Sequence, residues 1–209
     1  MRRLICVPIV HAESDLGSLV DRVAEAYERR FGRRQWQKRV RAVQAWWRGI
    51  EKRIDGFGLD LGRVVLFQDS LPVCGKEREI VEDMAHRGSP NHLLLLRLVA
   101  GGARLVGTES SDLLLREYAQ AKDLLEGRMY RQPDEARAAV ERAAASLVAR
   151  DRFIADRIGR TLRAEEIGLL FIGVRHAVDR YLPEDVRVEF LAHHLSPEDE
   201  SVAGGAHRE

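Results

Sequence analysis

Short apolar runs rich in β-branched residues recur along this 209-residue chain, and they constrain its fold more than any other feature. Runs of this kind, without a polar residue at every second position, are typical of strands that are buried on both faces in a parallel sheet. Four segments have this pattern: residues 4–10 (LICVPIV), 63–67 (RVVLF), 103–106 (ARLV) and 168–172 (GLLFI). A fifth, residues 186–191, alternates Val186, Val188 and Phe190 with polar residues, which predicts an edge strand.

Between these runs the apolar residues fall at steps of three and four, which is the period of an amphipathic helix. The predicted helices run from about Asp15 to Phe31, over 33–55, from Pro90 to about 100, after 107–111 (GTESS), and from about Pro133 to Leu162. The helix at Pro90 has a clear start, because Ser89 can cap it and proline suits its first position. Asn91 and His92, in its first turn, could approach the site or bind an anion there, but surface capping is the favoured interpretation.

Strands that alternate with helices imply a mostly parallel central sheet flanked by helices. We therefore predict a single α/β domain over residues 1–195, in which residues 33–55 form a basic helical insertion. Residues 196–209 contain too little apolar surface to fold and are expected to form a disordered tail.

Composition limits the partners and the location of the protein. The 34 Lys and Arg residues nearly balance 33 Asp and Glu residues, so nothing suggests a general affinity for nucleic acid or membranes, and any such affinity would have to be local. No run reaches the roughly 18 apolar residues that a membrane helix needs, and the apolar N-terminal run is too short for a signal peptide. Cys6 and Cys74 form no Cys-x-x-Cys pair, so we expect a cytoplasmic protein.

Ionisable residues follow each of the four buried strands. In open α/β sheets, ligands bind at the carboxyl ends of the strands, so we expect these residues to form one site there. Plainer interpretations are also open for these residues. His11 and Glu13 could be a strand end that is hydrogen-bonded to its own helix, and His176 could be a core histidine whose hydrogen bonds are satisfied. Asp69 suits an ordinary turn, and Glu109 could stabilise the next helix through its dipole. The residues that follow the strands in turn are His11, Glu13 and Asp15, then Gln68 and Asp69, then Glu109, then Arg175 and His176.

A carboxylate interrupts the apolar stripe of the long helix. The stripe runs from Val140 to Leu162 in steps of three or four, and Asp151 lies within it. A buried carboxylate is costly unless it is paired or binds a metal. We therefore expect Asp151 to meet His176 or a loop backbone across the core, and we expect its neighbour Arg150 to point elsewhere.

The two histidines, the carboxylates and the arginine allow two kinds of chemistry. Imidazole and carboxylate groups suit a divalent Zn, Mn, Co or Fe ion. The same groups without a metal could perform acid/base catalysis, with histidine as proton carrier and glutamate as general base. The spacing of the residues does not separate these alternatives.

Four motifs carry a resemblance to a known family. They are HAE after the first strand, GTES after a middle strand, RDRFIADRI on a helix, and GVRHAVDRYL after a late strand. Their order resembles the superfamily that joins Tiki/TraB-type proteins, erythromycin-esterase-like proteins and ChaN-like haem-uptake proteins. The resemblance spans His11 to Leu182, but Pro8 occupies the glycine position of the first Gly-x-x-His motif, so only the second motif is complete.

The resemblance implies a site and a class of activity. It makes His11 and His176 site or metal-ligand histidines, Glu109 an acidic site residue that could share the metal, and Arg150 with Asp151 a helix pair. The hypothesis that follows is a metal-dependent hydrolase of a peptide, ester or related bond. Because members of the superfamily also bind haem, the alternative is a non-catalytic protein that binds a small molecule or a tetrapyrrole.

Specific roles in the hydrolase hypothesis fall to three residues. A bound metal, Glu109 or Glu13 would activate a water molecule for attack on a small-molecule or peptide substrate. Arg150 would stabilise the negative charge that develops.

The segment 33–55 carries eight cations against Glu51 and Asp55, together with three tryptophans. Trp36 and Trp47 lie on the apolar stripe, so the cations are expected to form a solvated face. A third hypothesis is a nucleic-acid-associated module that uses this helix. The helix could also cover a cleft or pair with another copy of the chain as a homo-oligomer.

Overall fold

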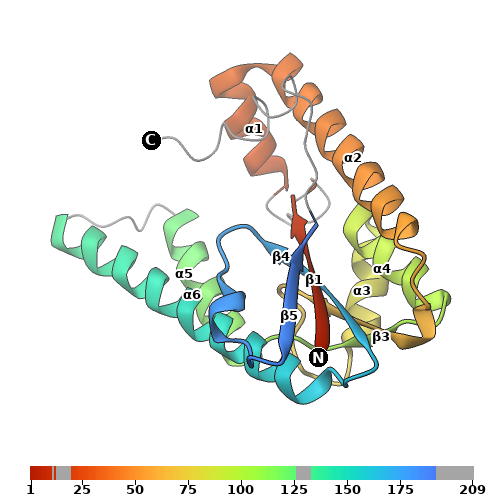
Figure 1. Ribbon diagram of the computed structural model, residues 1–209. Helices are drawn as coiled ribbons and strands as arrows, with labels where there is room; N and C mark the ends of the chain where they lie inside the picture. The colour runs from red at the N-terminus through yellow and green to blue at the C-terminus, as the bar shows by residue number, and fades with distance from the viewer. Residues whose placement is uncertain (11, 13–19, 126–132, 192–209) are drawn as a thin grey trace.

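The computed structural model describes residues 1–10, 12, 20–125 and 133–191, which form a five-stranded parallel sheet with helices on both faces (Figure 1). The order of the strands in the sheet is β3-β2-β4-β1-β5, and every ladder is parallel. The strands are β1 (Arg2–Ile9), β2 (Val64–Gln68), β3 (Arg104–Val106), β4 (Ile167–Gly173) and β5 (Val186–Phe190). The predicted α/β fold is confirmed, and β5 lies at an edge of the sheet as expected.

The helices match those expected from the sequence except for α3, which the sequence pattern did not indicate. They are α1 (Val20–Phe31), α2 (Arg33–Gly56), α3 (Glu77–His86), α4 (Pro90–Ala100), α5 (Ser111–Leu125) and α6 (Pro133–Thr161), with short 3-10 helices η2 (Leu61–Arg63) and η3 (Val178–Tyr181). As predicted, Ser89 caps α4, because its side chain accepts a hydrogen bond from the backbone of His92. None of the described helices is long and apolar enough to cross a bilayer. The predicted tail at 196–209 lies outside the described residues.

Each face of the sheet has its own hydrophobic core, because successive residues of a strand point to opposite faces. On one face, Ile5 of β1 packs with residues of α2 and α4. On the other, Leu4 packs with Ile154 of α6 and Val178 of η3. The helices that follow β1 and β2 therefore cover one face, whereas the helices before and after β4 cover the other. Such a change of face is where α/β proteins bind ligands, at the carboxyl ends of the strands.

Only part of α6 is buried, which corrects the expected length of its apolar stripe. Val140 is 70% exposed, and continuous packing against the sheet begins near Arg150. The reason is length: 29 helical residues extend about 44 Å, whereas the seven residues of β4 extend about 23 Å. The first half of α6 therefore projects beyond the sheet (Figure 1).

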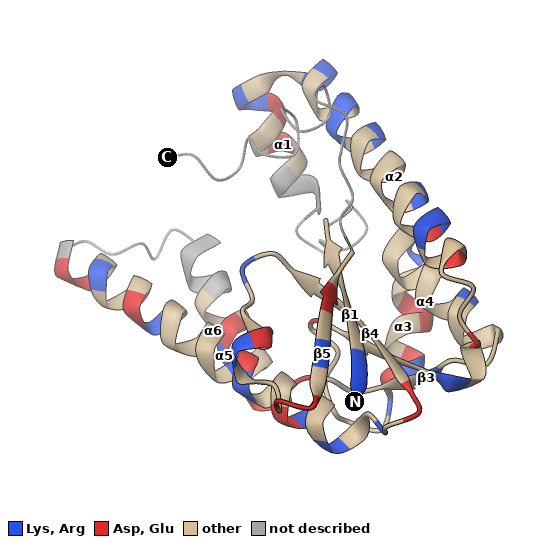
Figure 2. Cartoon of the chain, viewed as in Figure 1, with Lys and Arg blue, Asp and Glu red and all other residues tan. Residues whose placement is uncertain are grey.

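The tryptophans of α2 are buried, as the apolar stripe predicts. Trp36, Trp46 and Trp47 are at most 8% exposed, and Trp47 Nε1 donates a hydrogen bond to the carbonyl of Val10 at 3.0 Å. Cations occupy the opposite side of the helix, and Figure 2 shows them following one another along α2, whereas acidic and basic residues alternate along α6. Helix α2 is thus held through its aromatic side and presents its charges outward.

Candidate functional site

Asp69 lies at the centre of a polar cluster at the carboxyl ends of β2 and β4. Its backbone N–H donates to the carbonyl of Phe171 at 2.8 Å, which extends the pairing of β2 with β4 by one residue. Its Oδ2 accepts a hydrogen bond from the backbone N–H of Gly173 at 3.2 Å, and the side chain is 8% exposed. Two neighbouring strands therefore hold this carboxylate where the connections change face.

The next residue, Ser70, has a backbone φ of 64°, which is rare for a residue with a side chain. This conformation lets its N–H donate to Glu109 Oε1 at 2.8 Å, while its hydroxyl donates to Asp69 Oδ1 at 3.2 Å. The unusual turn thus orders two carboxylates at once.

Glu109 is placed by bonds between the loops that follow β2 and β3. The backbone N–H groups of Thr108 and Glu109 both donate to the carbonyl of Leu71, at 2.9 and 3.0 Å. The Thr108 hydroxyl accepts a hydrogen bond from the backbone of Gln68 at 2.9 Å. These bonds bury Glu109 completely, at 0% exposure.

Arg150 binds these carboxylates from α6. Its Nε donates to Glu109 Oε2 at 2.6 Å, and its Nη2 donates to Glu109 Oε1 at 2.6 Å and to Asp69 Oδ1 at 2.7 Å. Its Nη1 donates to Glu117 of α5. Burial alone would lower the pKa of Arg150, but the carboxylates outweigh burial and raise it.

This geometry corrects two expectations about Arg150. The side chain does not point away from the core, since it is 4% exposed. It is also not open to stabilise a developing negative charge, because all three guanidinium nitrogens already bond to carboxylates. Glu109 is equally enclosed, because its two oxygens accept from Arg150 and Ser70, so it anchors the arginine and is not open to a ligand.

His176, in the loop after β4, meets Asp151 as the sequence predicts. Its Nδ1 lies 2.5 Å from Asp151 Oδ1, and Asp151 Oδ2 accepts a hydrogen bond from the backbone of Ala177 at 2.9 Å. Its Nε2 faces Asp69 Oδ2 at 3.5 Å. Burial alone would lower the pKa of His176, but the bonds to Asp151 and Asp69 outweigh it and raise the pKa to about 9. Asp69 in turn is held ionised, since His176 and Arg150 overcome the effect of burial and depress its pKa.

The structure thus brings together six of the residues that the sequence predicts at the site: Gln68, Asp69, Glu109, Arg150, Asp151 and His176. His11, Glu13 and Asp15 lie outside the described residues, so their placement is not described. Strand β1 does end beside β4, since Ile9 pairs with Gly173. Arg175 is exposed to solvent and is not part of the cluster.

Asn91 is buried, which corrects its expected role as a surface cap. It is 2% exposed, and its Nδ2 donates to Gln68 Oε1 at 3.1 Å. Gln68 Nε2 donates in turn to the carbonyl of Asp69 at 3.0 Å. Asn91 therefore supports the backbone of the central carboxylate from α4, which agrees with the alternative that this first turn approaches the site.

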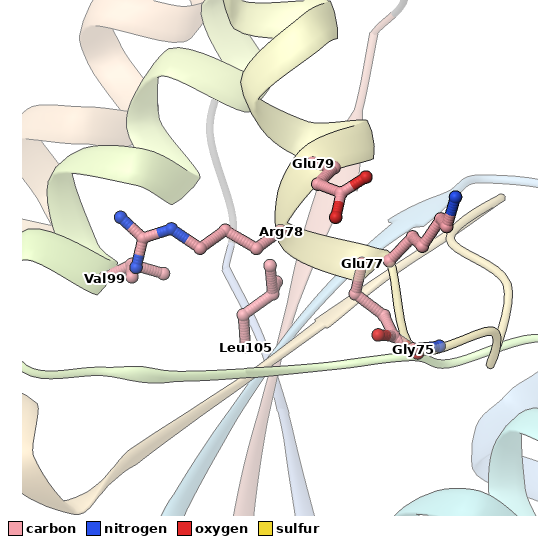
Figure 3. Close-up of a pocket in the computed structure, with 7 residues that line it drawn as sticks. Gly75, Glu77, Arg78, Glu79, Val99 and Leu105 are labelled. Atoms are coloured by element: carbon pink, nitrogen blue, oxygen red, sulfur yellow. The ribbon is translucent and has the colours of Figure 1, made fainter.

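A separate pocket of about 260 Å³ lies beside β3 at the start of α3 (Figure 3). Glu77 in its wall accepts hydrogen bonds from the backbone of Cys74 and Gly75, at 2.9 and 3.1 Å. The pocket shares no residue with the polar cluster. Its lining residues are Gly75, Lys76, Glu77, Arg78, Glu79, Val99 and Leu105.

Within the described ranges, no group of three or more His, Cys, Asp or Glu side chains is arranged to hold a metal ion. Comparisons with protein families, with curated proteins and with solved structures found no match to this chain.

Proposed function

We propose that the protein is a hydrolase whose reaction takes place at His176 and Asp69, assisted by a divalent metal ion. The observation that carries the proposal is the row of three side chains Asp151, His176 and Asp69, joined at 2.5 and 3.5 Å. A carboxylate on one imidazole nitrogen fixes the ring and its tautomer, and it leaves the other nitrogen directed at a single point. In this row, that point lies beside a second carboxylate.

The distance between His176 Nε2 and Asp69 Oδ2 suits a shared metal ion. Two donors that bind one small cation at about 2.1 Å lie about 3.0 to 3.5 Å apart in octahedral or tetrahedral geometry. An imidazole with a carboxylate is a donor pair that Zn, Mn, Co and Fe accept. These two residues, with the predicted ligand His11, would hold the ion.

The charge of the cluster favours a divalent cation at this point. Asp69, Glu109 and Asp151 supply three buried carboxylates, and Arg150 supplies one guanidinium. With His176 neutral, these groups carry a net charge of −2, which one divalent ion would cancel. Without such an ion, the proton that His176 holds compensates part of this charge, in keeping with its raised pKa. Binding of the metal should therefore release a proton.

Each residue of the cluster then has a distinct role. A divalent ion held by His176 and Asp69 would supply Lewis acidity for the hydrolysis of a peptide, ester or related bond by water. Asp151 orients His176, and Arg150 holds Asp69 and Glu109 in place. Because Arg150 and Glu109 satisfy each other, we assign both of them positioning roles and not direct contact with substrate.

Metal analysis of the purified protein tests the proposal. Wild type, His176→Ala and His86→Ala are each loaded with Mn, Co, Zn or Fe, desalted and analysed for bound metal. His86 is a matched control because it is an exposed histidine on α3, away from the cluster. We expect about one equivalent in the wild type and in His86→Ala, and loss of metal in His176→Ala.

Asp151→Asn sharpens this test. Because the asparagine keeps the shape but not the charge, metal affinity should fall by about 10- to 100-fold without being abolished. Unchanged metal content in His176→Ala, with the fold intact, would contradict the proposed site. Hydrolysis of ester or peptide substrates by metal-free protein would instead favour acid/base chemistry at the same residues.

The haem alternative has less geometric support. The His176 side chain is only 5% exposed and its Nε2 faces a carboxylate, whereas an axial ligand must face an open macrocycle. A haem titration that produced a Soret shift abolished by His176→Ala would reverse this preference.

Cys6 and Cys74 are free thiols, which supports a reducing, cytoplasmic setting for the reaction.

A further inference from the structure

We propose that the outer face of α2 binds the phosphate backbone of a double-stranded nucleic acid without reading its sequence. We call this surface the basic face and define it by Arg34, Lys38, Arg41 and Arg48. It is a second binding surface, distinct from the site of the proposed hydrolase. It would explain why eight of the 34 Lys and Arg residues lie on this one helix of a chain whose overall charge is balanced.

The net charge of residues 29–50, which cover the end of α1 and most of α2, differs sharply from that of the rest of the chain. Residues 29–50 contain eight Lys and Arg residues and no Asp or Glu. Because the whole chain has a net charge of +1, the other 187 residues carry a net charge of −7. A local field of one sign on an otherwise acidic protein is a feature of surfaces that attract polyanions.

The cations of the basic face have no acidic partner within the described part of the chain, unlike exposed arginines on other helices. Within the described residues, no ion pair joins Arg34, Lys38, Arg41 or Arg48 to a carboxylate. Elsewhere, arginines on or directly after α3, α4 and α6 meet acidic partners, and both colours alternate along α6 in Figure 2. These pairs are Arg78–Glu82, Arg87–Asp83, Arg97–Glu51, Arg97–Asp55, Arg137–Glu141 and Arg160–Asp156.

Helix α2 is anchored in a way that holds the basic face outward. Trp36, Val43 and Trp47 lie on one side of the helix and are buried in the protein. The residues of the basic face, at steps of four, three and seven, lie on the opposite side and are exposed. The face is therefore ordered before any ligand binds, which reduces the entropic cost of binding.

The length of the basic face fits a duplex backbone. Arg34 and Arg48 are 14 residues apart, which corresponds to about 21 Å along the helix axis. Successive phosphates of one DNA strand are about 3.4 Å apart along the duplex axis, so a stripe of this length passes several of them. Four flexible cations could therefore neutralise about three to four phosphates.

The same anchoring argues against two other polyanion partners. Binding of single strands relies on bases that stack on exposed aromatic rings, but Trp36, Trp46 and Trp47 are buried. Insertion into an anionic membrane requires a free apolar side on the helix, and that side of α2 packs against the sheet. A duplex backbone needs neither feature, so it is the partner that the structure favours.

Titration of a fluorescently labelled 20-base-pair duplex with the full chain tests the proposal by anisotropy. DNA and RNA duplexes are used as separate arms, each with two unrelated sequences. With three to four phosphates contacted, affinity should fall by about 40- to 150-fold between 50 and 200 mM salt. The triple variant Arg34→Gln, Lys38→Gln, Arg41→Gln should bind at least tenfold more weakly than the wild type, with a much smaller salt slope.

A matched variant controls for net charge. Arg116→Gln, Arg137→Gln and Arg142→Gln together remove three exposed cations from α5 and α6 and should leave duplex affinity within about twofold. Near-UV circular dichroism of the tryptophans on α2 verifies that the basic-face variant is folded. His176→Ala should bind the duplex normally, so failure of the hydrolase proposal does not affect this one.

Three outcomes would overturn the proposal. They are equal duplex affinity of the basic-face variant and the wild type, tighter binding to a single-stranded 20-mer than to the duplex, and binding to vesicles of phosphatidylserine and phosphatidylcholine with none to either duplex.

Discussion

Removing Arg150 should destabilise the protein strongly, because the residue neutralises two carboxylates that are almost completely buried. Asp69 and Glu109 are 8% and 0% exposed, and both accept hydrogen bonds from the one guanidinium. Breaking a buried ion pair by removing one partner costs about 3–5 kcal/mol. Arg150→Met, which keeps the length and apolar character of the side chain, should therefore lose about 3–5 kcal/mol of unfolding free energy.

Equilibrium unfolding in urea measures this loss. With an m-value of about 3 kcal/mol/M, the midpoint should fall by about 1.0 to 1.7 M. The matched control is Glu117→Ala, which removes the remaining ion pair of Arg150. Because the Glu117 side chain is 49% exposed, its loss should cost less than about 1 kcal/mol.

A second substitution separates the charge effect from loss of packing. The double variant Arg150→Met, Glu109→Gln leaves only one of the two carboxylates without a partner. Its free energy of unfolding should therefore be at least about 1 kcal/mol higher than that of Arg150→Met alone. Lower pH should have the same effect, because protonation of the unpaired carboxylates reduces the difference in unfolding free energy between Arg150→Met and the wild type. An Arg150→Met protein as stable as the wild type, or a Glu117→Ala protein equally destabilised, would refute the idea that buried charge dominates this cluster.

Three further predictions test other parts of the structure. Gly107→Ala would place a Cβ 2.7 Å from the backbone of the loop after β2 and should lower the free energy of unfolding by about 1–3 kcal/mol. Gly56→Ala, whose Cβ would have nothing within 4 Å, should be neutral or slightly stabilising in the same unfolding assay. Burial raises the pKa of the Cys6 thiol to about 12, whereas Cys74 is exposed. A disulfide reagent should therefore react with one thiol in the folded protein and with two in guanidinium. Reaction of both thiols in the folded protein would mean that the core around β1 is open. Burial disfavours ionisation of Glu77, but hydrogen bonds from backbone amides outweigh it and hold the pKa of its carboxyl below the ordinary 4.5. The loss of unfolding free energy in Glu77→Gln should therefore be largest at pH 7 and shrink as the pH falls below 4.5. A difference in unfolding midpoint that stays constant from pH 7 to pH 3 would contradict the lowered pKa.

The sequence predicts the strands well because their patterns are local. Strands β1, β2 and β4 are apolar on both faces, and such short runs rich in β-branched residues are typical of a sheet covered on both sides. The contact between Asp151 and His176 is predictable for a similar reason. A carboxylate in an apolar stripe must find a partner, and His176 follows the strand to which the long helix leads.

The centre of the cluster is harder to predict because it depends on which strands are neighbours. Asp69 followed by Ser70 suits any turn, and it becomes central only because β4 inserts beside β2. The resemblance places Arg150 beside Asp151 in the site, but the helical pattern alone does not, because adjacent helical residues are taken to diverge. They are separated by about 100° around the axis, so both Arg150 and Asp151 can face inward where loops from three strands surround the helix.

The strand order also has a consequence for synthesis of the chain. In the sheet, β1 pairs with β4 and β5 and with no other strand of the described chain. Strand β1 ends at Ile9, whereas its first partner begins at Ile167. During translation, a strand that is apolar on both faces must therefore wait for most of the chain to emerge before its hydrogen-bonding edges are covered. Such a chain is exposed to aggregation while it waits and folds slowly once complete, so a fragment that ends before β4 should depend on chaperones to stay in solution.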